Sequence, residues 1–190
     1  MEEWRKGWHP ETITPKQSDA KVLVVGAGPA GLSAAHKVGL RGYEVAMAEA
    51  TAELGGRVTR ESKLPGLNAW ARVRDYRQGQ IAKMANVNIY RDSALTADDV
   101  LGFGFEHVAI ATGARWRRDG IARYNLLPIP LAATMPIFSP DDLMAGALPS
   151  GEVVVYDDDH YYMGSVLAEL LVQKGCKVTF VTPASRVAEW

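Results

Sequence analysis

The segment from residue 21 to residue 50, KVLVVGAGPAGLSAAHKVGLRGYEVAMAEA, constrains the fold of this chain more than any other. It opens with an aliphatic run of the kind found in strands that are buried on both faces of a parallel sheet. Apolar residues at helical spacing follow the glycines, and EVAMAE then forms a second apolar run. This order predicts a β-strand, an α-helix and a parallel β-strand, the unit from which doubly wound sheets are built.

The glycines between the first strand and the helix have the spacing GxGxxG. Gly26 permits a tight turn, Gly28 lets the backbone approach a pyrophosphate, and Gly31 lets the helix pack closely on the sheet. The helix N-terminus adds N–H donors and the positive end of a dipole. The glycine pattern alone is a weak signal, but the flanking strand and helix agree with it, as does Glu49 at the end of the second strand. Together they predict a nucleotide site.

A carboxylate at the end of the second strand accepts hydrogen bonds from both ribose hydroxyls and repels a 2′-phosphate, so we expect an unphosphorylated adenosine ribose. The segment ELGGRV, residues 53–58, lies where a second glycine loop could approach the cofactor, and ATG at 111–113 follows a later strand. Both favour FAD or ADP over NAD. The predicted cofactor-binding residues are Gly26, Gly28, Pro29, Ala30, Gly31, Glu49, Ala50, Gly55, Gly56, Arg57, Thr112 and Gly113.

The rest of the chain repeats the alternation of strands and helices. Apolar residues recur at helical intervals over 68–84, and NVNIY and EHVAIATGA are predicted strands. Thr96 and Ser139 each precede a short helix whose first turn holds aspartates, which the helix dipole favours. GEVVVY and CKVTFV flank a predicted helix over about 163–174, which completes a second strand–helix–strand unit.

The predicted fold class is α/β, with a Rossmann-like doubly wound parallel sheet of the FAD/NAD(P)-binding type. The truncated start of a second βαβ nucleotide-binding-like domain follows it. The expected domains are an N-terminal linker or arm over 1–20, an FAD/ADP-binding Rossmann-like domain over 21–120, a crossover over 121–150, and a partial NAD(P)-domain-like βαβ unit over 151–190.

Composition narrows the classes of partner. The net charge of −1 over 190 residues gives no electrostatic reason to expect nucleic acid or an anionic membrane. No apolar run is long enough to span a bilayer, and we expect a cytoplasmic protein. The single cysteine, Cys176, excludes a CxxC pair or a cysteine-ligated cluster within this sequence and is expected to lie in the core.

The second strand–helix–strand unit lacks the glycine pattern. In VVVYDDDHYYMG, Asp157 and Asp159 stand about where the first glycines would be, and only Gly164 remains before the helix. Side chains there block close backbone approach, and their charge opposes a pyrophosphate. The following strand ends in VTPA, without a ribose-binding carboxylate. We therefore expect no nicotinamide nucleotide at this position.

The segment DDDHYY suggests two further interpretations. Three aspartates suggest a metal site, but consecutive acids before a helix are more often N-caps and a cluster that complements the helix dipole, so no metal is expected. His160 with Tyr161 and Tyr162 suggests acid–base chemistry, but no nucleophile or second base is visible nearby. Packing or a solvated loop is the favoured interpretation, and no catalytic residue is predicted.

The chain resembles the trimethylamine dehydrogenase family of iron–sulfur flavoproteins, which includes dimethylamine and histamine dehydrogenases. The resemblance extends over nearly the whole chain. Many flavoproteins share the glycine motif, whereas GWHPE, RDYRQ and ATGARW together are much more specific to this family. In that family an N-terminal barrel with covalent FMN oxidises the amine and a cysteine-ligated 4Fe-4S cluster follows. Two nucleotide-binding-like domains complete the chain, and the first holds ADP in the best-known member.

The resemblance implies that this sequence corresponds to those two domains, with ADP or FAD as its own cofactor. FMN and the 4Fe-4S cluster are expected only in the missing N-terminal part. An adenine nucleotide is the expected ligand, and the full-length family implies an electron-transferring flavoprotein and a homodimer as partners. The barrel, the FMN attachment and the cluster cysteines are not in this sequence, so we do not expect this chain alone to oxidise an amine.

The function that the resemblance favours is the ADP- or FAD-binding portion of an iron–sulfur flavoprotein amine dehydrogenase of the trimethylamine dehydrogenase type, with a structural and not a catalytic nucleotide site. One alternative is a stand-alone FAD-dependent NAD(P)H oxidoreductase, which the aspartates of the second unit and the absent redox cysteines oppose. Another is a nucleotide-binding interaction module without a redox role.

Overall fold

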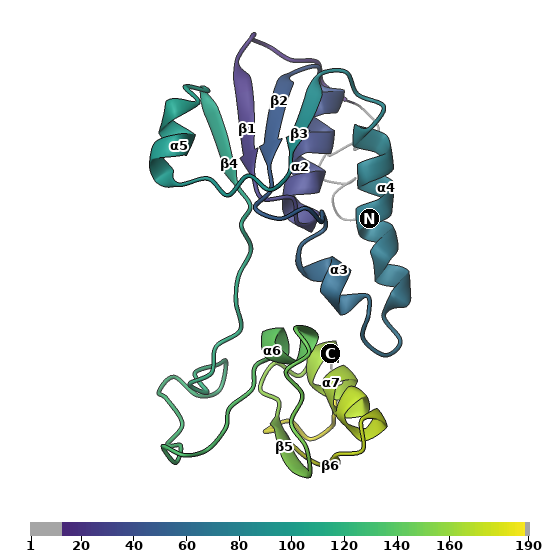
Figure 1. The fold of residues 1–190 in the computed structure, drawn as a ribbon, viewed down its shortest axis with the longest axis vertical. Helices are drawn as coiled ribbons and strands as arrows, with labels where there is room; N and C mark the ends of the chain where they lie inside the picture. The colour runs from purple at the N-terminus through teal and green to yellow at the C-terminus, as the bar shows by residue number, and fades with distance from the viewer. Residues whose placement is uncertain (1–12, 189–190) are drawn as a thin grey trace. The chain divides into compact units, whose positions relative to one another are not determined.

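The structure is a computed structural model that describes residues 13–188. It divides into two compact units, which we call unit 1 and unit 2. Unit 1 comprises residues 13–59 and 71–113, and unit 2 comprises residues 60–70 and 114–188 (Figure 1). The assignment of residues 60–70 to unit 2 was not part of the expected domain pattern.

Unit 1 is built on a four-stranded parallel sheet in the order β3-β2-β1-β4. Its strands are β1 (Lys21–Val25), β2 (Glu44–Ala48), β3 (Val87–Tyr90) and β4 (His107–Ile110). Only the first residue of β1 and of β2 is exposed, because both strands lie inside the sheet and both of their faces are covered. The strands predicted from the apolar runs are therefore confirmed.

Helices cover both faces of this sheet, which confirms the doubly wound fold class (Figure 1). The helices of unit 1 are α2 (Pro29–Leu40), α4 (Ala71–Ile81) and α5 (Ala97–Gly102). On one face Leu32 of α2 and Ile81 of α4 are buried against β1 and β2. On the other face Leu23 and Ala46 pack against Val100 of α5. Alternate residues of each central strand thus enter opposite cores.

Unit 2 contains a two-stranded parallel sheet, and α7 packs on it. Its elements are η1 (Asn68–Trp70), α6 (Pro140–Met144), β5 (Glu152–Tyr156), α7 (Tyr162–Gln173) and β6 (Lys177–Val181), while α3 (Arg57–Glu61) leads into it from unit 1. The core includes Leu167 and Leu171, and Leu64 and Leu67 bring residues 60–70 into it. Cys176 is buried in this core, as predicted.

Two predicted helix caps are present as capping boxes. The Thr96 side chain accepts a hydrogen bond from the Asp99 amide, while Asp99 accepts from the Thr96 amide at 2.8 Å. Ser139 and Asp142 repeat this arrangement at the start of α6. Hydrogen bonds from Thr96, first of all from its side chain, lower the pKa of Asp99, and those from Ser139, first of all from its backbone, lower the pKa of Asp142.

The predicted N-terminal arm lies only partly within the described residues, since residues 1–12 are outside them. Its described part lies against the turn between α2 and β2. The Lys16 amide donates to the Arg41 carbonyl at 2.7 Å, and the Gln17 amide donates to the Tyr43 hydroxyl at 3.1 Å. Across residues 13–188, no helix combines the length and the apolar character that a membrane span requires.

Candidate nucleotide-binding site

The loop between β1 and α2 is a tight glycine turn, and the first turn of α2 packs closely against it. Gly26 has φ +98°, and its amide donates to the Ala48 carbonyl at 2.7 Å. A Cβ at Gly26 would lie 2.5 Å from the Ala111 carbonyl oxygen, and a Cβ at Gly31 would lie 1.8 Å from the Gly26 carbonyl oxygen. Both positions therefore require glycine for the fold itself, whatever the loop binds.

Gly28 differs from these two glycines because the space beside it is open. No atom lies within 4 Å of a Cβ built there, and its φ of −68° is accessible to any residue. Gly28 is the N-cap of α2, and no side chain caps that helix end. The open space next to the start of a twelve-residue helix fits a pyrophosphate, because the helix dipole and the N–H groups of the first turn attract an anion.

Glu49 lies directly after β2, and three donors hold its carboxylate. The Ala27 amide donates to Oε2 at 2.8 Å. The amide and the hydroxyl of Thr51 both lie 3.0 Å from Oε1. The backbone of Glu49 is fixed as well, since its amide donates to the Tyr90 carbonyl at 2.8 Å and its carbonyl accepts from the Ser93 amide at 2.8 Å. The chain's own hydrogen bonds thus hold the carboxylate beside the glycine turn.

The second glycine loop contacts the first, as the segment ELGGRV suggested. The Gly55 amide donates to the Ala27 carbonyl at 2.8 Å, and a Cβ at Gly56 would lie 3.1 Å from the Gly28 Cα. Both glycines have positive φ, +103° and +52°. Arg57 follows at the start of α3 and is half-buried. Glycine at 55 and 56 allows this close approach of the two backbones.

The remaining predicted residues lie at the ends of β2 and β4 and at the start of α2. Ala50 follows Glu49, and Pro29 and Ala30 form the first positions of α2. The Ala111 amide donates to the Val25 carbonyl at 2.7 Å, which sets the end of β4 beside that of β1. Thr112 and Gly113 follow and are exposed. All the predicted residues lie in unit 1, at the carboxyl edge of one parallel sheet, where open α/β sheets bind ligands.

Sequence reasoning missed two members of this arrangement, Ala27 and Thr51. Ala27 acts through its backbone, with its amide on Glu49 and its carbonyl on Gly55, so its side chain carries no signal. A hydroxyl two residues after a strand-end carboxylate is a weak signal that could have pointed to Thr51. Within residues 13–188, no three His, Cys, Asp or Glu side chains are grouped so that they could hold a metal ion.

The loop after β5 in unit 2 occupies the position that corresponds to the glycine turn of unit 1. The Asp157 amide donates to the Val181 carbonyl at the end of β6, 2.9 Å away, as Gly26 does to the end of β2. Residues 157–161 separate β5 from α7, whereas only residues 26–28 separate β1 from α2. A Cβ on Gly164, in the first turn of α7, would lie 2.6 Å from the Asp157 carboxyl carbon. The chain's own carboxylate therefore fills the space next to this helix.

The structure corrects the interpretation of the aspartates as N-caps. The N-cap of α7 is Tyr161, and no side-chain hydrogen bond caps this helix. Asp157 instead accepts hydrogen bonds from the amides of Asp159 and His160, at 3.2 and 3.3 Å. Asp159, expected to stand with Asp157 where glycines would be, is exposed, and the second buried carboxylate is Asp158. The loop before α7 is longer than the glycine turn of unit 1, so the aspartates do not lie where the glycine spacing would place them.

His160 packs in unit 2, as the favoured interpretation of DDDHYY held. Its side chain is buried, its φ is +60°, and its ring stacks on Tyr124 with the centroids 5.0 Å apart. Asp158 accepts a hydrogen bond from the Tyr124 amide at 3.0 Å and lies 3.9 Å from His160 Nε2. Tyr162 packs on the Trp70 ring. These contacts fold the segment around Tyr124 over the end of β5.

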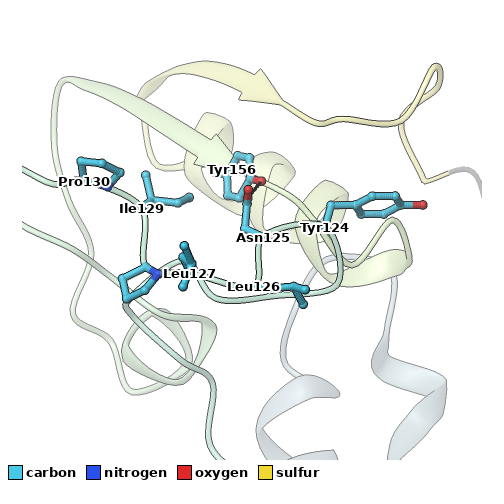
Figure 2. A pocket seen from close by; sticks show the side chains of 8 residues that line it. Tyr124, Asn125, Leu126, Leu127, Ile129, Pro130 and Tyr156 are labelled. Atoms are coloured by element: carbon cyan, nitrogen blue, oxygen red, sulfur yellow. Dashed lines mark hydrogen bonds between the residues drawn. The ribbon is translucent and has the colours of Figure 1, made fainter.

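A shallow groove of unit 2 is lined by Tyr124, Asn125, Leu126, Leu127, Pro128, Ile129, Pro130 and Tyr156 (Figure 2). The Asn125 amide donates to the Tyr156 hydroxyl across it. Leu126 and Leu127 are 82% and 78% exposed. The side chains that line the groove are apolar apart from this pair and the Tyr124 hydroxyl, and none of them is charged.

The parallel sheet, the glycine turn and the strand-end carboxylate define a domain of the dinucleotide-binding oxidoreductase class. The chain belongs to the pyridine nucleotide-disulphide oxidoreductase family, whose model matches residues 20–128. It is 40% identical over 189 residues to dimethylamine dehydrogenase from Hyphomicrobium sp. (strain x), a match that covers 95% of this chain and 26% of that protein.

Two solved structures also match the whole chain. Histamine dehydrogenase from Rhizobium sp. 4-9 has a TM-score of 0.94 at 58% identity, and 30% of its chain is covered. The 6-hydroxypseudooxynicotine amine oxidase of Pseudomonas geniculata N1 has a TM-score of 0.94 at 52% identity, and 29% of its chain is covered. The predicted resemblance to the trimethylamine dehydrogenase family is confirmed. This chain spans between a quarter and a third of the length of each of these proteins.

Proposed function

We propose that unit 1 binds an adenine nucleotide, ADP or the ADP half of FAD, and that this site is structural. The pyrophosphate lies against Gly28 and the start of α2, and the ribose hydroxyls donate to Glu49. The observation that carries the proposal is the conjunction of open space at Gly28 with a carboxylate fixed beside it, 2.8 Å from the Ala27 amide.

A structural role is supported by the chemistry of the residues around the site. The predicted cofactor-binding residues offer mainly backbone amides, one carboxylate and the Arg57 guanidinium, all of which are groups that bind a ligand. Cys176, the single cysteine of the sequence, is buried in the core of unit 2. A thiol–disulfide redox pair therefore cannot form within this chain. Any oxidation or reduction at the site would have to be supplied by a bound flavin.

The wider function follows from the relatives. We propose that this chain serves as the nucleotide-binding region of an amine dehydrogenase that acts in the cytoplasm. The complete enzyme would be a homodimer that passes electrons from the amine through FMN and a 4Fe-4S cluster, both held outside this sequence, to an electron-transferring flavoprotein. The similarity to dimethylamine dehydrogenase, to histamine dehydrogenase and to the amine oxidase supports this assignment.

A second candidate is an FAD-dependent NAD(P)H oxidoreductase, which the pyridine nucleotide family itself brings into consideration. The loop after β5 opposes it. A nicotinamide nucleotide at α7 would meet the buried carboxylate of Asp157, which lies against Gly164. At an effective dielectric of about 20, two like charges about 4 Å apart repel by roughly 4 kcal/mol.

The test is to denature the purified chain and identify the released nucleotide by absorbance and mass, and then to titrate the stripped protein with ADP by calorimetry. Released or rebound ADP without flavin supports the structural site. Released FAD together with NADH-dependent dye reduction supports the second candidate. Failure to release or bind any adenine nucleotide contradicts the proposal.

A further inference from the structure

Thr51 lies between Glu49, the residue proposed to bind the ribose, and the backbone of its own loop. Its amide and its hydroxyl oxygen are each 3.0 Å from Glu49 Oε1. The hydroxyl oxygen is also 3.0 Å from the Glu53 carbonyl, and the Thr51 carbonyl accepts from the Asp92 amide at 3.3 Å. Thr51 is thus fixed by the loops after β2 and β3, and it contacts Oε1 of the carboxylate, whereas the Ala27 amide contacts Oε2.

The two oxygens of the Glu49 carboxylate therefore have different anchors. Oε2 is held by one backbone amide, and Oε1 is held by a second backbone amide and by the one side-chain donor of the three. A carboxylate that is hydrogen-bonded at both oxygens keeps one orientation of its plane. Oε1 already carries two donors, and Oε2 retains a lone pair for a further one. A ribose hydroxyl that donates to Oε2 needs that fixed orientation, because the lone pair has to point toward the donor.

We propose that Thr51 is a positioning residue that sets the orientation of the Glu49 carboxylate and thereby determines recognition of the unmodified ribose 2′-hydroxyl. The single proton of the Thr51 hydroxyl goes to the charged Oε1 in preference to the neutral Glu53 carbonyl, and with the Thr51 amide it restricts rotation of the carboxylate about its Cγ–Cδ bond. Without that donor the carboxylate keeps its charge and its two backbone donors, the amides of Ala27 and Thr51, but with one donor fewer on Oε1 its plane is less tightly fixed. The preference for ADP over 2′-deoxy-ADP then weakens more than the overall affinity for the nucleotide.

This inference rests on the proposed adenine-nucleotide function, and the experiment separates the two. The affinities of ADP and 2′-deoxy-ADP are measured by calorimetry for the stripped wild-type chain and for Thr51→Val, Thr51→Ser and Thr14→Val. Thr51→Val keeps the shape and removes the hydroxyl, and Thr51→Ser restores it. Thr14→Val makes the same chemical change at an exposed threonine of unit 1, away from this loop.

In the wild type we expect ADP to bind about tenfold more tightly than 2′-deoxy-ADP, because a hydrogen bond to a charged group is lost. That ratio falls to about threefold or less in Thr51→Val, and it returns to the wild-type value in Thr51→Ser and stays there in Thr14→Val. A purely structural role would lower both affinities equally and leave the ratio unchanged.

The outcomes that overturn the inference are distinct from those that overturn the function. An unchanged ratio in Thr51→Val, with ADP still bound by the wild type, overturns the role of Thr51 and leaves the nucleotide site standing. A wild-type chain that binds both nucleotides equally overturns the ribose assignment of Glu49, and with it this inference. A wild-type chain that binds neither nucleotide overturns the proposed function itself.

Discussion

The Ala27 amide donates a 2.8 Å hydrogen bond to Glu49 Oε2 and so joins the glycine turn after β1 to the end of β2. The Ala27 carbonyl also accepts from the Gly55 amide, which adds the second glycine loop. One residue between two glycines thus connects three segments of the chain. The chain's own hydrogen bonds tie these segments to one another, so a nucleotide bound there would contact loops that the fold itself holds together.

Glu49→Ala should weaken ADP binding by about ten- to a hundredfold, since hydrogen bonds to a charged group contribute roughly 1.5–3 kcal/mol. Calorimetric titration of the stripped protein measures this loss. Glu53→Ala is the matched control, because Glu53 is an exposed carboxylate of the same loop whose contact is with Arg74, 3.7 Å away. Equal affinities of Glu49→Ala and Glu53→Ala would rule out a ribose role for Glu49.

The glycines of the turn should separate by function when each is replaced by alanine. Gly31→Ala places a Cβ 1.8 Å from the Gly26 carbonyl oxygen, so we expect it to destabilise unit 1 by about 3 kcal/mol or more. Gly28→Ala meets no atom within 4 Å, so its effect on stability should stay under about 1 kcal/mol. Its methyl group would instead intrude on the pyrophosphate and abolish ADP binding.

Urea unfolding and ADP titration of both variants test this contrast. Gly79→Ala is the control, because Gly79 lies in α4 with nothing within 4 Å of a Cβ. It should stabilise the protein by about 0.5–1 kcal/mol and leave binding unchanged. Normal ADP affinity in Gly28→Ala would show that the phosphate does not lie where we place it.

His36 should make the stability of unit 1 depend on pH. Burial is the main reason that the pKa of His36 is lowered, and the charges of Lys37 and Arg77 lower it further. The folded state therefore favours the neutral imidazole, and the unfolded state binds a proton at a higher pH. The contribution is fully present above the ordinary histidine pKa of about 6.5 and is lost as the pH falls from there through the folded pKa.

Urea unfolding at several pH values between 7.5 and 5 measures this effect. The wild type should lose stability on acidification, and His36→Gln should lose less over the same range. His107→Gln serves as the control, since His107 is exposed at the start of β4. If His36→Gln and the wild type lose stability in parallel, another group is responsible for the pH dependence.

The strands and long helices could be predicted because their apolar residues repeat with the period of the element. The match of β1 and α2 to KVLVV and the helix after GAGPAG shows this. The placement of residues 60–70 in unit 2 could not be predicted, because Leu64 and Leu67 lie in an irregular segment whose core is completed by residues distant in the sequence. Periodicity reports local geometry and carries no information about such contacts.

The same limit applies to the candidate site. Glycine spacing predicted where Gly26, Gly28 and Gly31 would lie, because Gly26 and Gly31 answer steric demands of the backbone and fix the turn that contains Gly28. The role of Thr51 depends on the orientation of one side chain toward another, which spacing does not encode. In unit 2, three consecutive aspartates gave no sign of which would be buried, because the length of the loop before α7 decides that.

The sheet of unit 2 leads to the last prediction, which concerns self-association. Within residues 13–188, β5 pairs with β6 and with no other strand. Val154, Tyr156 and Val181 on these strands are 67%, 40% and 42% exposed. Edge strands with exposed apolar side chains tend to pair with strands of other molecules. The purified 190-residue chain should therefore show an average mass that rises with concentration in light scattering.

Val154→Lys should reduce this association, because a charge in the middle of β5 must be desolvated when two sheets meet. Val172→Lys is the matched control. It makes the same change at a residue of α7 that is 58% exposed, on a helix, which has no strand edge with which another strand could pair. If both variants reduce the association equally, general apolar exposure is its cause, and the strands have no special part. A monomeric wild type at all concentrations would contradict the prediction outright.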